Sequence, residues 1–232
     1  MKSKIEICYL CGQSLDADIS DDHIPPKQFY AKSIRKIHSL NLFTLPTHKS
    51  CNNSYQNDED YFVHSLAPLA MESYSGDAIW KDISNQCKRP EGIRIRKMIK
   101  REFGTRPSGI ILPGGKVLKR FNGDRVWRIV WKITRGLFFK EKGKFLPEGA
   151  GRSYKIFSVR EETAPKEFVY VNKTPPRGKY PAVFDYKYME IPKLDDLNFW
   201  AMFFWDTIIT LIVFHDPDCS CNICKGLINK QS

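Results

Sequence analysis

The order of apolar and polar positions predicts a mixed α+β protein. Residues 4–10 alternate as a short strand that leads into a Cys-x-x-Cys-Gly turn, and residues 40–45 form a second apolar strand. The polar, acidic stretch 12–22 is expected to be loop, and 46–51 a turn. From residue 52 onward, aromatic and aliphatic residues recur three to four positions apart, which predicts a helix.

Two basic helices are predicted downstream, at 93–104 and 124–142, with a Gly/Pro-rich linker between them. In the second helix, apolar residues lie near one face, and Arg125, Arg128, Lys132 and Arg135 lie largely on another. Beyond it, runs of β-branched and aromatic residues predict strands over 154–159, 167–171 and 182–189.

The most apolar segment, 197–214, is weighed as a membrane span and set aside. Its length is marginal, Asp206 lies in its middle, and its flanks carry acidic residues instead of Lys or Arg. We predict a buried helix over 197–205 followed by a buried strand over 207–214.

The chain has 232 residues, of which 42% are hydrophobic, so it can bury one large core or two small ones. Intrinsic disorder and a disulfide-stapled miniprotein are excluded. The first residues contain no apolar run long enough for a signal peptide, which predicts a cytoplasmic protein. We expect three segments: 1–72, a basic helix and linker over 73–115, and a mixed α/β accessory domain over 116–232.

Positive charge is concentrated in the middle of the chain. Residues 88–160 carry a net charge of +16, whereas the rest of the chain sums to −5. A basic block of this size favours a polyanionic partner, nucleic acid before an acidic membrane face. A lysine-rich surface that serves only solubility is the alternative.

Two half-sites for a metal ion lie near the two ends of the segment formed by the first 52 residues. Cys8 and Cys11 share a tight turn, and His48 and Cys51 have the same spacing. Three thiolates and one imidazole are a donor set preferred by structural zinc. The alternative is that the cysteines are small core residues and His48 a turn residue. A second set of soft ligands near the end of the chain leaves open a second metal or reduced loop cysteines: His215, Cys219, Cys221 and Cys224.

Between the half-sites lies the sequence Asp22-His23-Ile24-Pro25, and Asn52 directly follows Cys51. Over residues 8–62 this pattern resembles the HNH endonuclease family of bacteria, with its zinc knuckle. The resemblance implies a ββα-metal nuclease module over 1–72.

The resemblance also implies roles for three residues. His23 would be the general base that activates water, and Asp22 and Asn52 would hold one Mg²⁺ or Mn²⁺ through oxygen donors. Phosphodiester hydrolysis needs both a base and a hard cation. The alternatives are an N-cap role for Asn52 and a turn role for Asp22.

Other residues are ranked lower. The asparagine that gives the family its middle letter has only Asn41 as a counterpart, two residues out of register. Gln56 is a candidate further metal ligand and Lys27 a candidate phosphate contact. The acidic run 58–60 is interpreted as a solvated face.

Together these patterns predict a metal-dependent HNH endonuclease that hydrolyses nucleic acid, most simply duplex DNA bound through residues 88–160. The alternative is a zinc-stabilised, non-catalytic nucleic-acid-binding module or complex subunit. No membrane partner is expected, and a homodimer or a complex with another protein is left open.

Overall fold

The computed structural model describes residues 7–16, 18–38, 42–104, 118–150, 152–159, 164–191 and 197–219. It confirms the α+β class. The elements follow in this order along the chain: β1 (Ile19–His23), η1 (Lys27–Phe29), α1 (Lys32–His38), β2 (Thr44–His48), α2 (Lys49–Asn53), α3 (Gln56–Leu66), η2 (Ala67–Ala70), α4 (Tyr74–Cys87), η3 (Pro90–Gly92), α5 (Ile93–Glu102), β3 (Phe103–Gly104), β4 (Leu118–Lys119), α6 (Gly123–Lys142), β5 (Arg152–Ser158), α7 (Lys166–Val171), β6 (Phe184–Ile191), β7 (Leu197–Phe204) and β8 (Ile208–His215).

The N-terminal strands differ from those predicted. β1 and β2 pair antiparallel, so β1 replaces part of the loop predicted over 12–22. β2 starts later than expected and includes Pro46, which an edge strand tolerates because its N–H side needs no partner. α2 then begins at Lys49, inside the predicted turn. Of the strand predicted over 4–10, Ile7 makes only an isolated bridge and the next residues form a turn; residues 1–6 lie outside the described residues.

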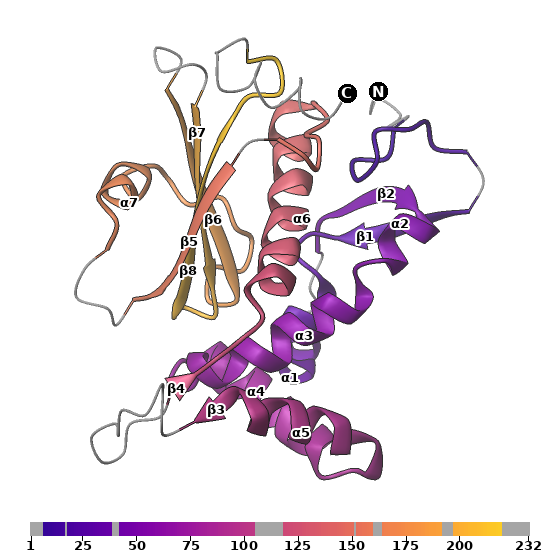
Figure 1. Ribbon diagram of the computed structural model, residues 1–232, viewed down its shortest axis with the longest axis vertical. Helices are drawn as coiled ribbons and strands as arrows, with labels where there is room; N and C mark the ends of the chain where they lie inside the picture. The colour runs from indigo at the N-terminus through magenta and orange to yellow at the C-terminus, as the bar shows by residue number, and fades with distance from the viewer. Residues whose placement is uncertain are drawn as a thin grey trace.

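A four-stranded antiparallel sheet, in the order β5-β8-β7-β6, forms the second half of the chain. α6 runs along one face of this sheet and α7 lies on the other (Figure 1). Trp200, Met202 and Phe204 of β7 belong to the buried cluster that includes α6. Ala201 belongs to the cluster that includes Val171 of α7. Both faces of the sheet are therefore covered.

The helix predicted over 197–205 is wrong, because this segment is the strand β7; the following strand, β8, is confirmed. A strand buried on both faces reads as a continuous apolar run without alternation, which periodicity alone cannot separate from a buried helix. Trp205 and Asp206 form the turn between the strands with φ of 53° and 55°. In the described part of the chain, no helix combines the length and apolar composition that a membrane crossing requires.

The strand predicted over 167–171 is also wrong, because these residues form the helix α7. Phe168 and Val171, three residues apart, pack against the sheet, whereas Val169 and Tyr170 are more than half exposed. This is helical spacing. The two basic helices are confirmed as α5 and α6.

Buried residues from the N-terminal segment, α6 and the sheet form a single large cluster. The ring of Phe29 stacks on Phe62 with centroids 4.9 Å apart, and the indole of Trp205 donates a hydrogen bond to the Phe29 carbonyl at 2.9 Å. Gly136 lets α6 approach closely, because a Cβ there would overlap the side chain of Ile24. α6 is consequently packed between the sheet and the β1–β2 pair (Figure 1).

Candidate functional site

Four residues from two separate segments meet near the start of the chain. They are Cys8 and Cys11 of the first turn, His48 at the end of β2, and Cys51 in α2. Their ligand atoms all lie within 4.8 Å of one another. In a tetrahedral zinc site with Zn–S bonds of about 2.3 Å, the sulfurs lie about 3.8 Å apart. The group, as predicted from its spacing, could hold a metal ion such as zinc.

Hydrogen bonding orients the imidazole of His48 toward the cysteines. Its Nε2 lies 3.0 Å from the Ser14 carbonyl oxygen and 3.5 Å from a carboxylate oxygen of Asp16. A proton on Nε2 therefore leaves the Nδ1 lone pair to face Cys11 Sγ at 3.3 Å and Cys51 Sγ at 4.0 Å. Metal-binding histidines typically have such a partner on the second nitrogen.

The three thiols influence one another. Burial would raise the pKa of Cys8, but hydrogen bonds from the backbone amides of His48 and of the turn outweigh it and lower this pKa. Burial, together with the sulfurs of Cys8 and Cys11, raises the pKa of Cys51 to about 12. A cation among the sulfurs would offset their mutual repulsion and favour the thiolates that bind metal.

A pocket of about 350 Å³ opens where β1 meets α2 and α3. Asp22, His23 and Asn52 all line it, so the fold brings together the three residues to which the family resemblance assigns chemistry. Lys27 and Gln56, which ranked lower, line it as well. The other lining residues are Asp21, Pro26, Gln28, Arg35, Asn53, Glu59 and Asp60.

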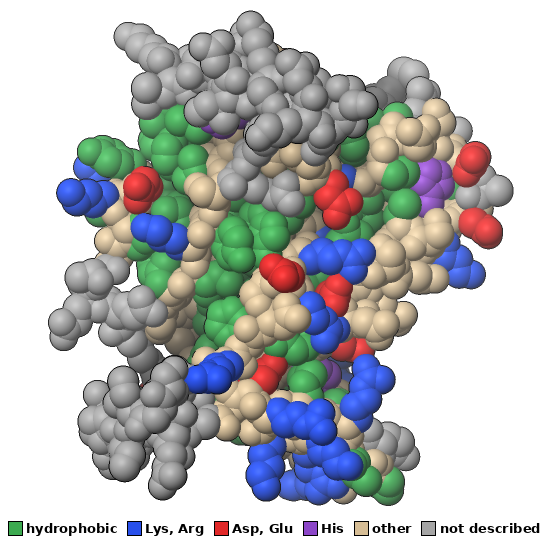
Figure 2. Space-filling model, in the orientation of Figure 1, with side chains coloured by type: hydrophobic (Ala, Val, Ile, Leu, Met, Phe, Trp, Pro, Cys, Tyr) green, Lys and Arg blue, Asp and Glu red, His purple; other side chains and the backbone are tan. Residues whose placement is uncertain are grey.

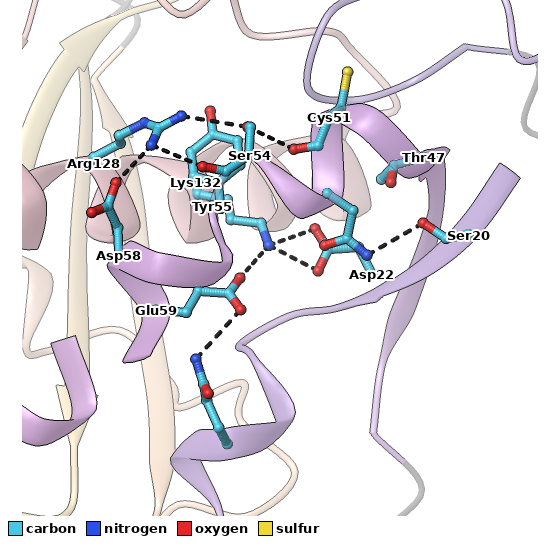
Figure 3. A network of polar contacts seen from close by, with 12 residues as sticks. Ser20, Asp22, Thr47, Cys51, Ser54, Tyr55, Asp58, Glu59, Arg128 and Lys132 are labelled. Atoms are coloured by element: carbon cyan, nitrogen blue, oxygen red, sulfur yellow. Dashed lines mark hydrogen bonds and ion pairs between the residues drawn. The ribbon is translucent and has the colours of Figure 1, made fainter. Parts of the chain in front are cut away.

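Asp22 is held by partners from two other parts of the chain. The residue is only 4% exposed. The hydroxyl of Tyr9, in the cysteine turn, donates a hydrogen bond to Oδ2 at 2.6 Å. The ammonium group of Lys132, in α6, lies 2.9 Å from Oδ1 and 2.8 Å from Oδ2 (Figure 3). Asp22 thus links the cysteine turn and the pocket to α6.

Lys132 also contacts a second carboxylate. Its Nζ lies 2.5 Å from Glu59 of α3, and the lysine side chain is only 1% exposed. Burial raises the pKa of Glu59, and Lys132 opposes this rise. Two carboxylates share one ammonium group, so the buried triad of Asp22, Glu59 and Lys132 carries a net charge of −1 when its members are ionised.

The prediction that residues 58–60 form a solvated acidic face is wrong for two of the three. Glu59 pairs with Lys132, and Asp58 accepts hydrogen bonds from Arg125 at 2.5 Å and Arg128 at 2.6 Å. These two carboxylates instead form ion pairs with basic side chains of α6.

Four basic residues of α6 form a row that faces the N-terminal segment, and we call this row the α6 seam: Arg125, Arg128, Lys132 and Arg135. Their spacing of three or four residues places them on one side of the helix. Arg135, only 1% exposed, donates to the Leu146 carbonyl at 2.9 Å and to the Leu10 carbonyl. From buried positions on α6, Lys132 thus binds the pocket residue Asp22, and Arg135 binds the cysteine turn.

His23 is half-buried at the pocket wall. Burial lowers the pKa of its imidazole, and Lys27 adds to this effect, while Asp22 opposes it. A lowered pKa keeps the ring neutral near pH 7, and the neutral ring is the form that accepts a proton.

Asn52 lies inside α2 and does not begin a helix. The N-cap of α2 is His48, so the N-cap alternative for Asn52 is wrong. The amide nitrogen of Asn52 donates to the Ser20 hydroxyl at 3.3 Å. This orientation leaves the amide oxygen as the group for another partner.

The oxygen donors in this pocket suit a hard divalent cation, because the carboxylate residue Asp22 and the amide residue Asn52 line the same pocket. A carboxylate has about four acceptor positions, and Tyr9 and Lys132 already make three contacts with Asp22. An ion bound to Asp22 would therefore share this carboxylate with the Lys132 ammonium group or displace it.

Sequence reasoning missed Lys132 as the partner of Asp22 and Arg35 as a pocket residue. Lys132 lies 110 residues from Asp22, and no local pattern connects them. Arg35 lines the pocket from α1, a helix that was not predicted, and within the described part of the chain its Nε is buried without a hydrogen-bond partner.

Some predicted residues cannot be placed. Asn41, Cys221 and Cys224 lie outside the described residues. His215 Nδ1 and Cys219 Sγ, which are described, lie 3.4 Å apart.

The chain matches no protein-family model, no curated protein and no solved structure. The geometry of the pocket and of the Cys3His group is therefore the basis for assigning a function.

Proposed function

We propose that this protein is a metal-dependent endonuclease of the HNH type, which hydrolyses phosphodiester bonds of nucleic acid, most simply DNA. The observation that carries the proposal is the convergence of Asp22, His23 and Asn52 on one pocket. Asn52 directly follows Cys51 of the Cys3His group. The pairing of β1 with β2, with α2 directly after β2, supports a ββα-metal module in which η1 and α1 lie between the two strands.

Each pocket residue has a role in the proposed reaction. His23, with its lowered pKa, takes the proton from the attacking water. Asp22 and Asn52 would hold one Mg²⁺ or Mn²⁺, which when bound neutralises charge on the phosphate. Lys27 and Arg35, on the same pocket wall, contribute positive charge toward a phosphate. The Cys3His group binds zinc and keeps the turn that contains Tyr9 folded.

One observation favours a second candidate, a nucleic-acid-binding module without catalysis. The Lys132 ammonium group and the Tyr9 hydroxyl already occupy most acceptor positions of the Asp22 carboxylate. A pocket that only binds nucleic acid would need no metal ion on Asp22 in addition to these contacts.

Nicking of supercoiled plasmid separates the two candidates. His23→Ala should lower the cleavage rate about 10²- to 10⁴-fold, because it removes the base. DNA affinity should barely change, because phosphate contacts elsewhere provide most of it. EDTA should stop cleavage by the wild type, and Mg²⁺ or Mn²⁺ should restore it.

His215→Ala is the matched control, because this histidine lies at the end of β8 and does not line the pocket. Cleavage by His23→Ala at the wild-type rate would refute the role of this residue. Tight binding without cleavage of any DNA or RNA by the wild type would favour the non-catalytic module.

A further inference from the structure

The helix α5 has one face that packs on the protein and two that face solvent. Ile95 and Ile99 pack against the core. With 3.6 residues per turn, Arg94, Lys97 and Arg101 fall together on one solvent face. Arg96 and Lys100 fall about 100° further around the helix, on the other part of its solvent-facing side.

Two cavities lie along the face of α5 that carries Arg94, Lys97 and Arg101. One, of about 760 Å³, is lined by all three of these residues. The other, of about 300 Å³, shares Arg94 and Arg125 with it. The second cavity in turn shares Asp60 with the pocket of His23. These shared walls form a groove that leads from α5 to the candidate catalytic pocket, and neither Arg96 nor Lys100 lines it.

The cations of this face are available to a ligand. Arg94, Lys97 and Arg101 are exposed, and none makes an ion pair or a hydrogen bond through its side chain to any residue that the structure describes. Lys and Arg side chains gather at the lower end of the surface in Figure 2, where Figure 1 places α5. The Glu102 carboxylate, which borders the same cavity, is already paired with Lys119 and with the Tyr61 and Ser65 hydroxyls.

The spacing of the three cations suits a nucleic-acid strand. Seven residues of α-helix separate Arg94 from Arg101, about 10 Å along the axis. One strand of a DNA duplex advances about 3.4 Å per phosphate along the duplex axis, so α5 lying parallel to that axis would span about three phosphates. Arg125 and Arg128, by contrast, are already bound to Asp58.

We propose that Arg94, Lys97 and Arg101 form a phosphate-binding track that holds duplex DNA and leads one strand to the pocket of His23. The proposal deepens the nuclease function proposed above and rests on it for the direction of the strand. Phosphate contacts of this kind position a duplex without reading its sequence.

Two matched pairs of substitutions test the track. Arg94→Gln with Lys97→Gln removes one arginine and one lysine from it, and Arg96→Gln with Lys100→Gln removes the same charges from the other side of α5. Duplex binding is measured against salt concentration, in the His23→Ala background so that the DNA stays intact. The slope of log K against log salt should become shallower by about 1.8 for the track pair, at about 0.9 per lost phosphate contact. At 0.15 M salt this corresponds to a loss of affinity of roughly 30-fold.

The outer pair should keep the wild-type slope. Arg94→Lys with Lys97→Arg should also keep it, which separates lost charge from a damaged helix. Equal slopes for the two Gln pairs, or a larger loss for the outer pair, would overturn the track. A track pair that weakens binding to anionic vesicles and leaves duplex binding unchanged would also overturn it. A shallower slope for the track pair, together with a wild-type protein that cuts no nucleic acid, would support the track and refute the nuclease.

Discussion

Helices α5 and α6 are both strongly basic, but their cations meet different surroundings. On α5, Arg94, Lys97 and Arg101 face an open groove. On α6, Lys132 and Arg135 are 1% exposed; Lys132 binds the carboxylates of Asp22 and Glu59, and Arg135 binds the Leu10 carbonyl of the N-terminal segment. The two helices look alike in the sequence, and they differ in what packs against them.

The comparison shows that a positive net charge does not by itself locate a nucleic-acid surface. The carboxylates of Asp22, Asp58 and Glu59 form ion pairs with the α6 seam, so its charges are paired within the protein. Its buried ion pairs must recover the cost of desolvation through good geometry and hydrogen bonds. α5 has no such acidic partner for its groove face among the described residues. The surface that we propose to bind nucleic acid is therefore smaller than the predicted segment 88–160 and consists of one face of α5.

The largest expected effect concerns the Cys3His group, proposed above to bind zinc, whose first turn is attached to α6 through Arg135 and the Leu10 carbonyl. Cys51→Ser should lower the free energy of unfolding by several kcal/mol, because the binding energy of structural zinc is about 10–16 kcal/mol and is coupled to folding. Hydrogen exchange should speed up in the middle of α6 and stay nearly unchanged in α5. Thermal unfolding, zinc content and hydrogen exchange measure these changes.

Cys87→Ser is the control for this experiment, because Cys87 lies on α4 and is not in the cluster. It should retain the zinc. A wild-type protein that purifies without metal and melts at the same temperature as Cys51→Ser would contradict the prediction.

The next effect tests the seam itself. Lys132→Met leaves Asp22 and Glu59 without their cation and should cost about 3–5 kcal/mol. For a chain of this size the melting temperature should fall by roughly 10 °C. Lys100→Met, on the outer face of α5, should change stability by no more than about 0.5 kcal/mol. Urea unfolding of both variants measures the difference between the helices.

A second substitution sharpens this result. Glu59→Gln, added to Lys132→Met, removes one of the two unpaired carboxylates and should recover part of the lost stability. Equal stability of Lys132→Met and Lys100→Met would mean that the seam contributes no more than an exposed charge.

The sequence predicts features that depend on local spacing and misses those that depend on distant packing. The apolar period of α6 and the two half-sites of the Cys3His group are both local patterns, and the structure contains the helix and brings the half-sites together. The run 197–205 fits a helix and a strand equally well in the sequence, and it is a strand because it pairs with β6 and β8 in a sheet that α6 and α7 cover on its two faces. The pairing of Lys132 with Asp22 arises because α6 packs against the β1–β2 pair, and Gly136 permits this approach.

The smallest expected effect lies at the other end of α6. Glu141 accepts hydrogen bonds from the Tyr186 hydroxyl at 2.6 Å and from Arg177 at 2.7 Å. Burial alone would raise the pKa of Glu141, but Tyr186, Lys140 and Arg177 outweigh it and lower this pKa below the usual 4.5. A lowered pKa in the folded state means that the carboxylate stabilises the fold above about pH 4.5. This contribution is lost as the pH falls through the lowered value.

Glu141→Gln should therefore be less stable than the wild type at pH 7, by about 1 kcal/mol or less because solvent screens the pairs. The difference should shrink as the pH falls from about 4.5 through the lowered pKa, because the unfolded chain takes up a proton at Glu141 first and the folded carboxylate takes one up last. Glu167→Gln, an exposed residue in the first turn of α7, should show no such convergence. Melting temperatures of the three proteins between pH 3 and pH 7 make the comparison. A gap between Glu141→Gln and the wild type that widens toward low pH would reverse the sign and show that Glu141 is better stabilised in its protonated form.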